Sequence, residues 1–322
     1  MNSTMKQVRR LSVAKAFGRY GILIGFFAIV AFLSVASPIF LKASNLVNIL
    51  RQVSIIGIVS MGMTMVIILG GIDLSVGSGL ALVGVVSSLL AKDPALPLFV
   101  PVVAGIATGG AVGLFNGVVI AKGRIVPFIV TLGTMTMARG LAFILAKGMP
   151  VGGLAEKFFI IGSGTVLGVP FLVVLFFAVF GLMAVVMRRT VLGRHVYAIG
   201  GNETAALASG IDVDRTKIAA YTILGLLVGV AGVVLASRIK SGQPAVASGY
   251  ELDAIAACVI GGVSFLGGIG GAAGTLLGTL IIGVINNGLD LLNVQTFYQQ
   301  IIKGAIIIVA VLMDRKRSAG SS

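Results

Sequence analysis

The chain has 322 residues, of which 57% are hydrophobic and only 11% are charged, and its mean hydropathy is +1.12. Soluble globular domains carry about 25% charged residues, so this composition excludes an ordinary soluble domain and indicates a protein embedded in lipid. The formal net charge is +14. Because the Lys and Arg residues lie in short blocks between apolar runs, the charge argues against nucleic-acid binding and fits the positive-inside pattern of membrane proteins.

Ten apolar runs approach the length of about 20 residues that a helix needs to cross the hydrocarbon core. The eighth run is short and glycine-rich, so we expect it to be broken or re-entrant. The sequence therefore predicts an all-α polytopic membrane protein with about ten transmembrane helices. The runs cover residues 21–40, 53–70, 76–92, 98–121, 127–146, 169–187, 218–237, 253–268, 272–292 and 298–313.

Basic residues set the expected orientation. Most of the 24 Lys and Arg residues lie before the first run, at 122–124, at 188–217 or after the last run. The positive-inside rule places these segments in the cytoplasm. We therefore expect a cytoplasmic tail at 1–20, a transmembrane domain at 21–313, a second cytoplasmic tail at 314–322 and both termini inside.

The long connection at 188–217 separates spans two to five from spans seven to ten. Span two would enter the membrane from outside and span seven from inside. A structural repeat between these two sets must therefore be inverted, which is an arrangement common in transporters.

A short helix is predicted within residues 188–217. Asn202 can cap its first turn, Glu203 lies at the positive end of its dipole, and Gly210 can end it in the left-handed conformation. A helix of this length is marginal alone in water, and its exposed side chains are mostly alanine. We therefore expect it to dock on a cytoplasmic partner protein or on its own membrane domain.

Residues 203–206, followed by Gly210, resemble the coupling loop by which permease subunits of ATP-binding cassette (ABC) importers engage their ATPase. More specifically, residues 198–203, with 209–211 after them, resemble the ribose permease branch, which also serves arabinose, galactose and xylose. Thr204 departs from the plain form of the motif, which has alanine there. The resemblance assigns ATPase coupling to Gly200, Gly201, Asn202, Glu203, Ala205, Ala206 and Gly210.

Further strings resemble the same branch, at 70–78, 242–244 and 249–257. The resemblance implies a permease of the bacterial inner membrane that imports ribose or a related monosaccharide. It also implies a homodimer or closely related heterodimer, a periplasmic or extracellular sugar-binding protein, and a cytoplasmic ATPase that uses ATP and Mg²⁺.

The sequence itself carries no phosphate-binding loop of the form G-x-x-x-x-G-K-[ST]. No Ser/His/acid constellation or cluster of metal-ligating residues is visible either. We therefore expect no catalytic residue, no metal and no cofactor on this chain, which makes it a transporter subunit rather than an enzyme.

Polar side chains within the spans need partners, because lipid offers none. Arg139 is the most intrusive charge, with Asp73 as one conceivable partner, whereas we expect Lys303 to snorkel outward. Helix caps and interhelical hydrogen bonds are the structural alternatives to a transport role. The candidate translocation path comprises Asp73, Ser75, Asn116, Arg139, Glu251, Asp253, Asn286 and Asn287.

Two other functions remain open at this point. An ion-coupled secondary transporter would also have ten spans and inverted halves, but should place coupling carboxylates near the middle of the membrane. An ABC permease for nucleosides or branched-chain amino acids would look broadly similar. An amino-acid substrate would favour buried groups complementary to a carboxylate and an amine, and the amides here lean toward a sugar.

Overall fold

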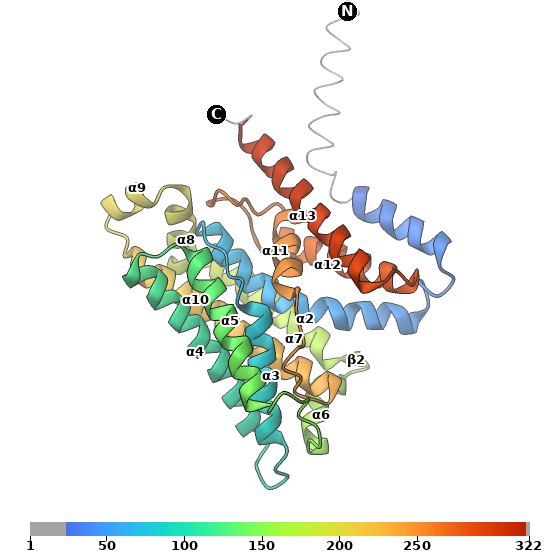
Figure 1. Cartoon of the computed structure of the whole chain (residues 1–322). Coiled ribbons are helices and arrows are strands. Elements are labelled where there is room, and N and C mark those ends of the chain that lie inside the picture. Colours follow the sequence, from blue (N-terminus) through green and yellow to red (C-terminus); the bar gives the residue numbers. More distant parts are fainter. Residues whose placement is uncertain (1–23, 320–322) are drawn as a thin grey trace, which may run out of the picture.

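The computed structural model describes residues 24–319 and consists almost entirely of helices (Figure 1). The expected tail at 1–20 lies outside the described residues. The all-α expectation is confirmed. In chain order, the elements are the helix Ile24–Ala36, α2 (Ala43–Ile68), α3 (Val76–Ala91), α4 (Phe99–Gly123), α5 (Pro127–Leu145), α6 (Glu156–Ser163), β1 (Thr165–Val166), β2 (Val169–Pro170), α7 (Phe171–Arg189), α8 (Val191–Gly201), α9 (Glu203–Ala208), α10 (Val213–Ile239), α11 (Tyr250–Ile260), α12 (Ala272–Leu291) and α13 (Thr296–Ala319).

Six of the described helices are long and apolar enough to cross a membrane, namely α2, α4, α5, α7, α10 and α12. Three other expected spans correspond to the shorter apolar helices Ile24–Ala36, Val76–Ala91 and Thr296–Val309. The eighth expected span is broken, as predicted: α11 ends at Ile260 and residues 261–271 are not helical. These helices support a multi-pass membrane protein.

Two elements differ from the sequence-based expectation. Helix α2 begins at Ala43 rather than near residue 53, because its polar first turns continue the helix and bury Asn45 against α12. The expected cytoplasmic loop at 188–217 is largely helical. It contains the whole of α8, whose first turn is capped by Thr190, since its hydroxyl accepts a hydrogen bond from the Gly193 amide at 3.2 Å.

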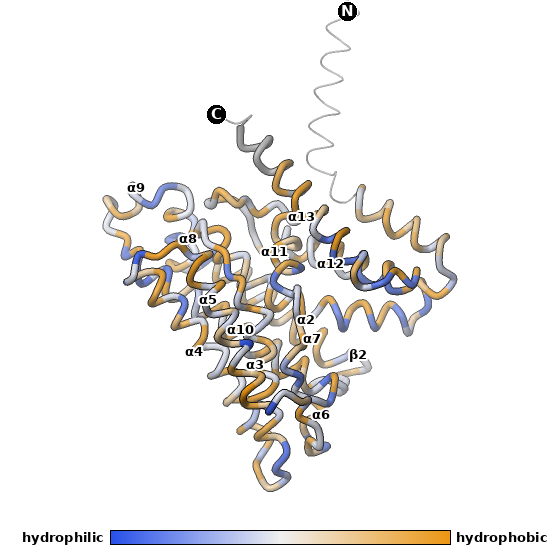
Figure 2. The backbone as a smooth tube through the Cα atoms, in the orientation of Figure 1, coloured by the Kyte–Doolittle hydropathy of each residue, from blue (hydrophilic) through white to orange (hydrophobic). Residues whose placement is uncertain are grey.

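Helix α2 forms the centre of the molecule and is buried along most of its length. It packs against α7, α10, α11 and α12. Large apolar side chains on α4, α5 and α7 remain exposed, as expected for faces that meet lipid. Hydrophilic residues gather near α9 and at the turn between α3 and α4 (Figure 2).

Helix packing supports the expected inverted repeat. The contacts of α3 with α4, α5 and α10 have counterparts in the contacts of α11 with α12, α13 and α2, and α4 packs on α10 as α12 packs on α2. Arg238 near the end of α10 donates to Asn48 near the start of α2 at 3.1 Å, which indicates that the two helices run antiparallel. The two sets of four helices are therefore α2 to α5 and α10 to α13.

Helices α4 and α10 approach each other closely through glycines on both helices. A Cβ added at Gly109 would lie 2.6 Å from the amide nitrogen of Gly229, and one added at Gly225 would lie 2.7 Å from the Cα of Gly113. Small residues replace the hydrophobic effect as the basis of helix packing in membranes. The high glycine content of the apolar runs is thus used at helix interfaces.

Candidate functional site

The short helix predicted near residue 202 is present as α9, with both ends as expected. Asn202 accepts a hydrogen bond from the Ala205 amide at 2.9 Å, which caps the first turn. At the other end, Gly210 has φ +81°, and the Ile211 amide donates to the Ala206 carbonyl at 3.1 Å in a Schellman arrangement. We call residues 202–210 the coupling segment.

The coupling segment rests on its own membrane domain while one face stays exposed. Lys217 on α10 donates to both carboxylate oxygens of Glu203, at 2.8 and 2.9 Å. Ala206 is buried, whereas Leu207 is 63% exposed. Sequence reasoning missed the Lys217 partner, because the pairing depends on where α10 begins. The exposed Leu207 leaves an apolar side chain on the free face of this segment.

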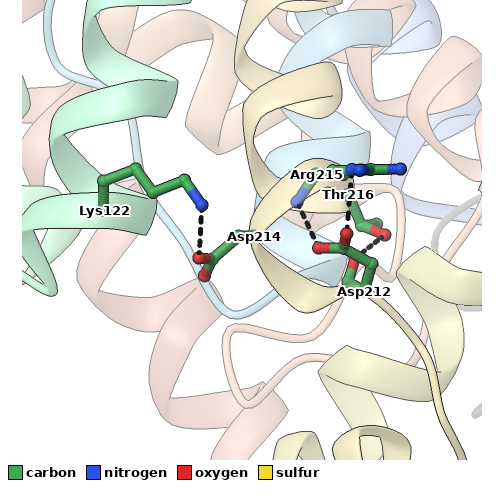
Figure 3. A network of polar contacts seen from close by, with 5 residues as sticks. All are labelled: Lys122, Asp212, Asp214, Arg215 and Thr216. Atoms are coloured by element: carbon green, nitrogen blue, oxygen red, sulfur yellow. Dashed lines mark hydrogen bonds and ion pairs between the residues drawn. The ribbon is translucent and has the colours of Figure 1, made fainter.

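A groove of about 650 Å³ borders the coupling segment between α9, the α4–α5 turn and the start of α10. Lys122 pairs with Asp214 at 3.1 Å across this region, and Arg215 pairs with Asp212 at 2.9 Å (Figure 3). Exposed ion pairs of this kind contribute about 0.2–1 kcal/mol each. The groove is lined by Ile120, Ala121, Arg124, Ile125, Val126, Pro127, Glu203, Leu207, Asp212, Val213, Asp214 and Lys217.

A first polar cluster consists of Asp73, Ser75, Asn116 and Thr134. Asp73 accepts from the Ser75 amide at 2.7 Å and its hydroxyl at 2.6 Å, and from the Asn116 amide group at 3.2 Å. Thr134 on α5 donates to Asn116 at 2.6 Å. All four side chains are buried. The cluster joins the segment before α3 to α4 and α5.

A cavity of about 10 Å³ lies beside Asp73 and Ser75. This volume suffices for about one water molecule, and a monosaccharide is far larger. In this conformation the first polar cluster connects helices, and this cavity is too small for a sugar.

A second polar cluster consists of Asp253, Asn286 and Lys303. Lys303 on α13 pairs with Asp253 on α11 at 3.0 Å, and Asn286 on α12 donates to Asp253 at 3.2 Å. The expectation that Lys303 snorkels outward is wrong, because a buried carboxylate lies within its reach. The Asn286 Oδ1 atom is buried and has no hydrogen-bond partner among the described residues.

The two clusters occupy corresponding places in the two helix sets. Each combines an aspartate beside the start of α3 or α11, an asparagine of α4 or α12, and a side chain of α5 or α13. They differ in charge, because a lysine pairs with Asp253 whereas no ion pair to Asp73 is found in residues 24–319.

The remaining candidate residues make other contacts. Arg139 donates to the carbonyls of Pro244 and Val246 at 2.7 and 2.9 Å, so it holds the 241–249 segment instead of pairing with Asp73. Glu251 accepts from the Gly249 amide at 3.1 Å, which is a local contact at the start of α11.

Asn287 exchanges hydrogen bonds with Asn45 at 2.9 and 3.0 Å, which joins α12 to α2. Sequence reasoning missed Asn45, Thr134 and Lys303 as members of these contacts. Each of these contacts joins two different helices, so the spacing of apolar residues gives no signal for it. The eight candidate path residues therefore form several helix contacts rather than one continuous site.

A profile of the family described as "Branched-chain amino acid transport system / permease component" matches residues 45–311. The ribose import permease protein of Bacillus subtilis (strain 168) is 45% identical over 316 residues, which are 97% of each chain. The ribose import permease protein of Escherichia coli (strain K12) is 46% identical over 92% of this chain and 93% of the relative.

The L-arabinose ABC transporter permease protein of Azospirillum brasilense is 43% identical over 96% of this chain and 91% of the relative. No solved protein structure matches the chain. The profile spans most of the helical body, including the coupling segment and both polar clusters. The chain therefore belongs to this family of transport-system permease components.

Proposed function

We propose that the chain is the permease subunit of an ATP-driven importer that moves ribose or a related monosaccharide across the bacterial inner membrane. The observation that carries this proposal is 45% identity to a ribose import permease across 97% of both chains. The arabinose relative, at 43% identity, has a different sugar in its name. The proposal therefore commits to a monosaccharide, with ribose as the first to be tested.

In this assignment, a sugar-binding protein outside the membrane delivers the substrate to a pair of permease chains. A cytoplasmic ATPase then binds the coupling segment and hydrolyses ATP with Mg²⁺. The exposed Leu207 beside the 650 Å³ groove supports such a docking role. The basic residues around α8, α9 and both ends of the chain support a cytoplasmic location for these parts.

The direct test is reconstitution in vesicles of the chain with the ATPase and sugar-binding protein that co-purify with it from mild detergent. ATP-dependent uptake of labelled ribose, arabinose, leucine and a nucleoside would then be compared. Ribose or arabinose uptake that needs all components supports the proposal. Uptake of leucine alone, or transport by the isolated chain under an ion gradient, would replace it with one of the two rival functions.

Disrupting the coupling segment should uncouple the ATPase from transport. Ala206→Pro removes the amide that donates to the Asn202 carbonyl at 2.9 Å, and Gly210→Val forces a branched residue into φ +81°. We expect ATP-dependent uptake to fall about tenfold, within the range of typical coupling free energies, while membrane insertion is unchanged. Gly181→Val is the matched control, since nothing lies within 4 Å of its Cβ position. Normal uptake by both variants would remove the coupling assignment.

Arg139 should matter for transport without affecting the ATPase contact. Arg139→Met removes the donor of two charge-assisted hydrogen bonds, each worth about 1.5–3 kcal/mol, and so releases the 241–249 segment. We expect uptake to fall while the ATPase still co-purifies. Arg189→Met, at an exposed position of α7, is the control. Equal uptake rates for the two variants would contradict this role.

A further inference from the structure

The last turn of α8 contacts the backbone of two other segments directly. A Cβ added at Gly200 would overlap the carbonyl oxygen of Ile68, the last residue of α2, and would lie 2.6 Å from the amide nitrogen of Gly268. By contrast, nothing lies within 4 Å of the Cβ position of the neighbouring Gly201. Only the first of these two glycines is therefore required by close packing.

The Ile68 carbonyl that faces Gly200 also accepts a hydrogen bond from the Gly268 amide at 2.9 Å. Gly267 and Gly268 have φ +86° and +72°, a region that favours glycine. A Cβ added at Gly267 would lie 2.6 Å from the Gly200 carbonyl oxygen. We call Ile68, Gly200, Gly267 and Gly268 the glycine junction, where three backbones meet.

A side-chain bond reinforces the same contact. The Tyr197 hydroxyl on α8 donates to the Gly270 carbonyl at 2.8 Å. Burial raises the pKa of the Tyr197 phenol above its ordinary value, against an opposing effect of Arg188. The phenol therefore keeps its proton, and its donor role, at neutral pH.

Each backbone in the glycine junction leads to a functional element. Gly200 is followed by Gly201 and then by Asn202, which ends α8 and caps α9. Ile68 leads through residues 69–72 to Asp73 of the first polar cluster. Residues 261–271 join α11, which carries Asp253, to α12, which carries Asn286.

We propose that Gly200 is a positioning residue for transport, which passes displacement of the coupling segment to the end of α2 and to the 261–271 segment through direct backbone contact. Closely packed backbones move together, whereas intervening flexible side chains would absorb a small displacement. The inference rests on the proposed function, because it needs a partner ATPase that displaces α9.

The test compares Gly200→Ala with Gly181→Ala in the full complex of permease, ATPase and sugar-binding protein in vesicles. Gly181 lies on α7, and nothing lies within 4 Å of its Cβ position. The readout is the number of sugar molecules taken up per ATP hydrolysed. We expect Gly200→Ala to lower this ratio about tenfold while the ATPase still co-purifies, and Gly181→Ala to keep the wild-type ratio.

Tyr197→Phe is the second variant, because it removes the hydroxyl bond to Gly270 without adding an atom. We expect a smaller reduction of the same ratio, with an unchanged melting temperature in detergent. A wild-type ratio in Gly200→Ala overturns the inference, and if that variant does not assemble, a wild-type ratio in Tyr197→Phe overturns it. Failure of the wild-type complex to import sugar with ATP would instead overturn the proposed function.

Discussion

Lys303→Met should destabilise the protein strongly. The substitution leaves the Asp253 carboxylate, 2% exposed, without the ammonium group that lies 3.0 Å away. Removing one partner of a buried ion pair costs about 3–5 kcal/mol, because the remaining charge has lost both water and its counter-charge. We expect a marked fall in the melting temperature of the detergent-solubilised protein, measured by size-exclusion after heating. Lys92→Met, at an exposed position, is the control.

The double variant Asp253→Asn with Lys303→Met separates lost charge compensation from lost packing. Both charges are gone, and an asparagine at 253 can still accept the hydrogen bond that Asn286 donates at 3.2 Å. We expect the double variant to recover most of the lost stability, since neutral replacements of buried pairs are often tolerated. If Lys303→Met has the same melting temperature as the Lys92→Met control, the pair does not stabilise the second polar cluster.

The same pair marks where sequence reasoning ends. The coupling segment could be predicted because its signals are local: Asn202 and Gly210 set the ends of a helix by their own backbone chemistry. Lys303 could not be paired with Asp253 in this way. The contact depends on where α11 begins and on how α13 packs against it, and neither follows from the spacing of apolar residues.

The start of α2 shows the same limit. Polar residues shorten the apolar run, so hydropathy places the span near residue 53, while the helix begins at Ala43. Asn45 is buried there because Asn287 supplies its partner from α12. The position of a polar residue in a membrane helix is therefore decided by a partner that lies far away in the sequence. The broken eighth span could be predicted because its glycines act locally.

Gly109→Leu should weaken the α4–α10 contact more than a substitution at a lipid-facing glycine. The Cβ position of Gly109 lies 2.6 Å from the Gly229 amide nitrogen and 2.7 Å from its Cα, so a larger side chain must separate two helix backbones. Overpacking a close-packed interior costs about 1–3 kcal/mol, and occasionally more. We expect a lower melting temperature and less protein recovered from the membrane.

Gly181→Leu on α7 is the matched control, because the same side chain enters open space there. Separation of α4 from α10 should also displace Asn116, which lies on α4 and holds Asp73 at 3.2 Å. Gly109→Leu protein that survives extraction should therefore also transport more slowly, although no polar residue has changed. Wild-type stability and uptake in this variant would mean that the glycine contact is not needed to hold the two helix sets together.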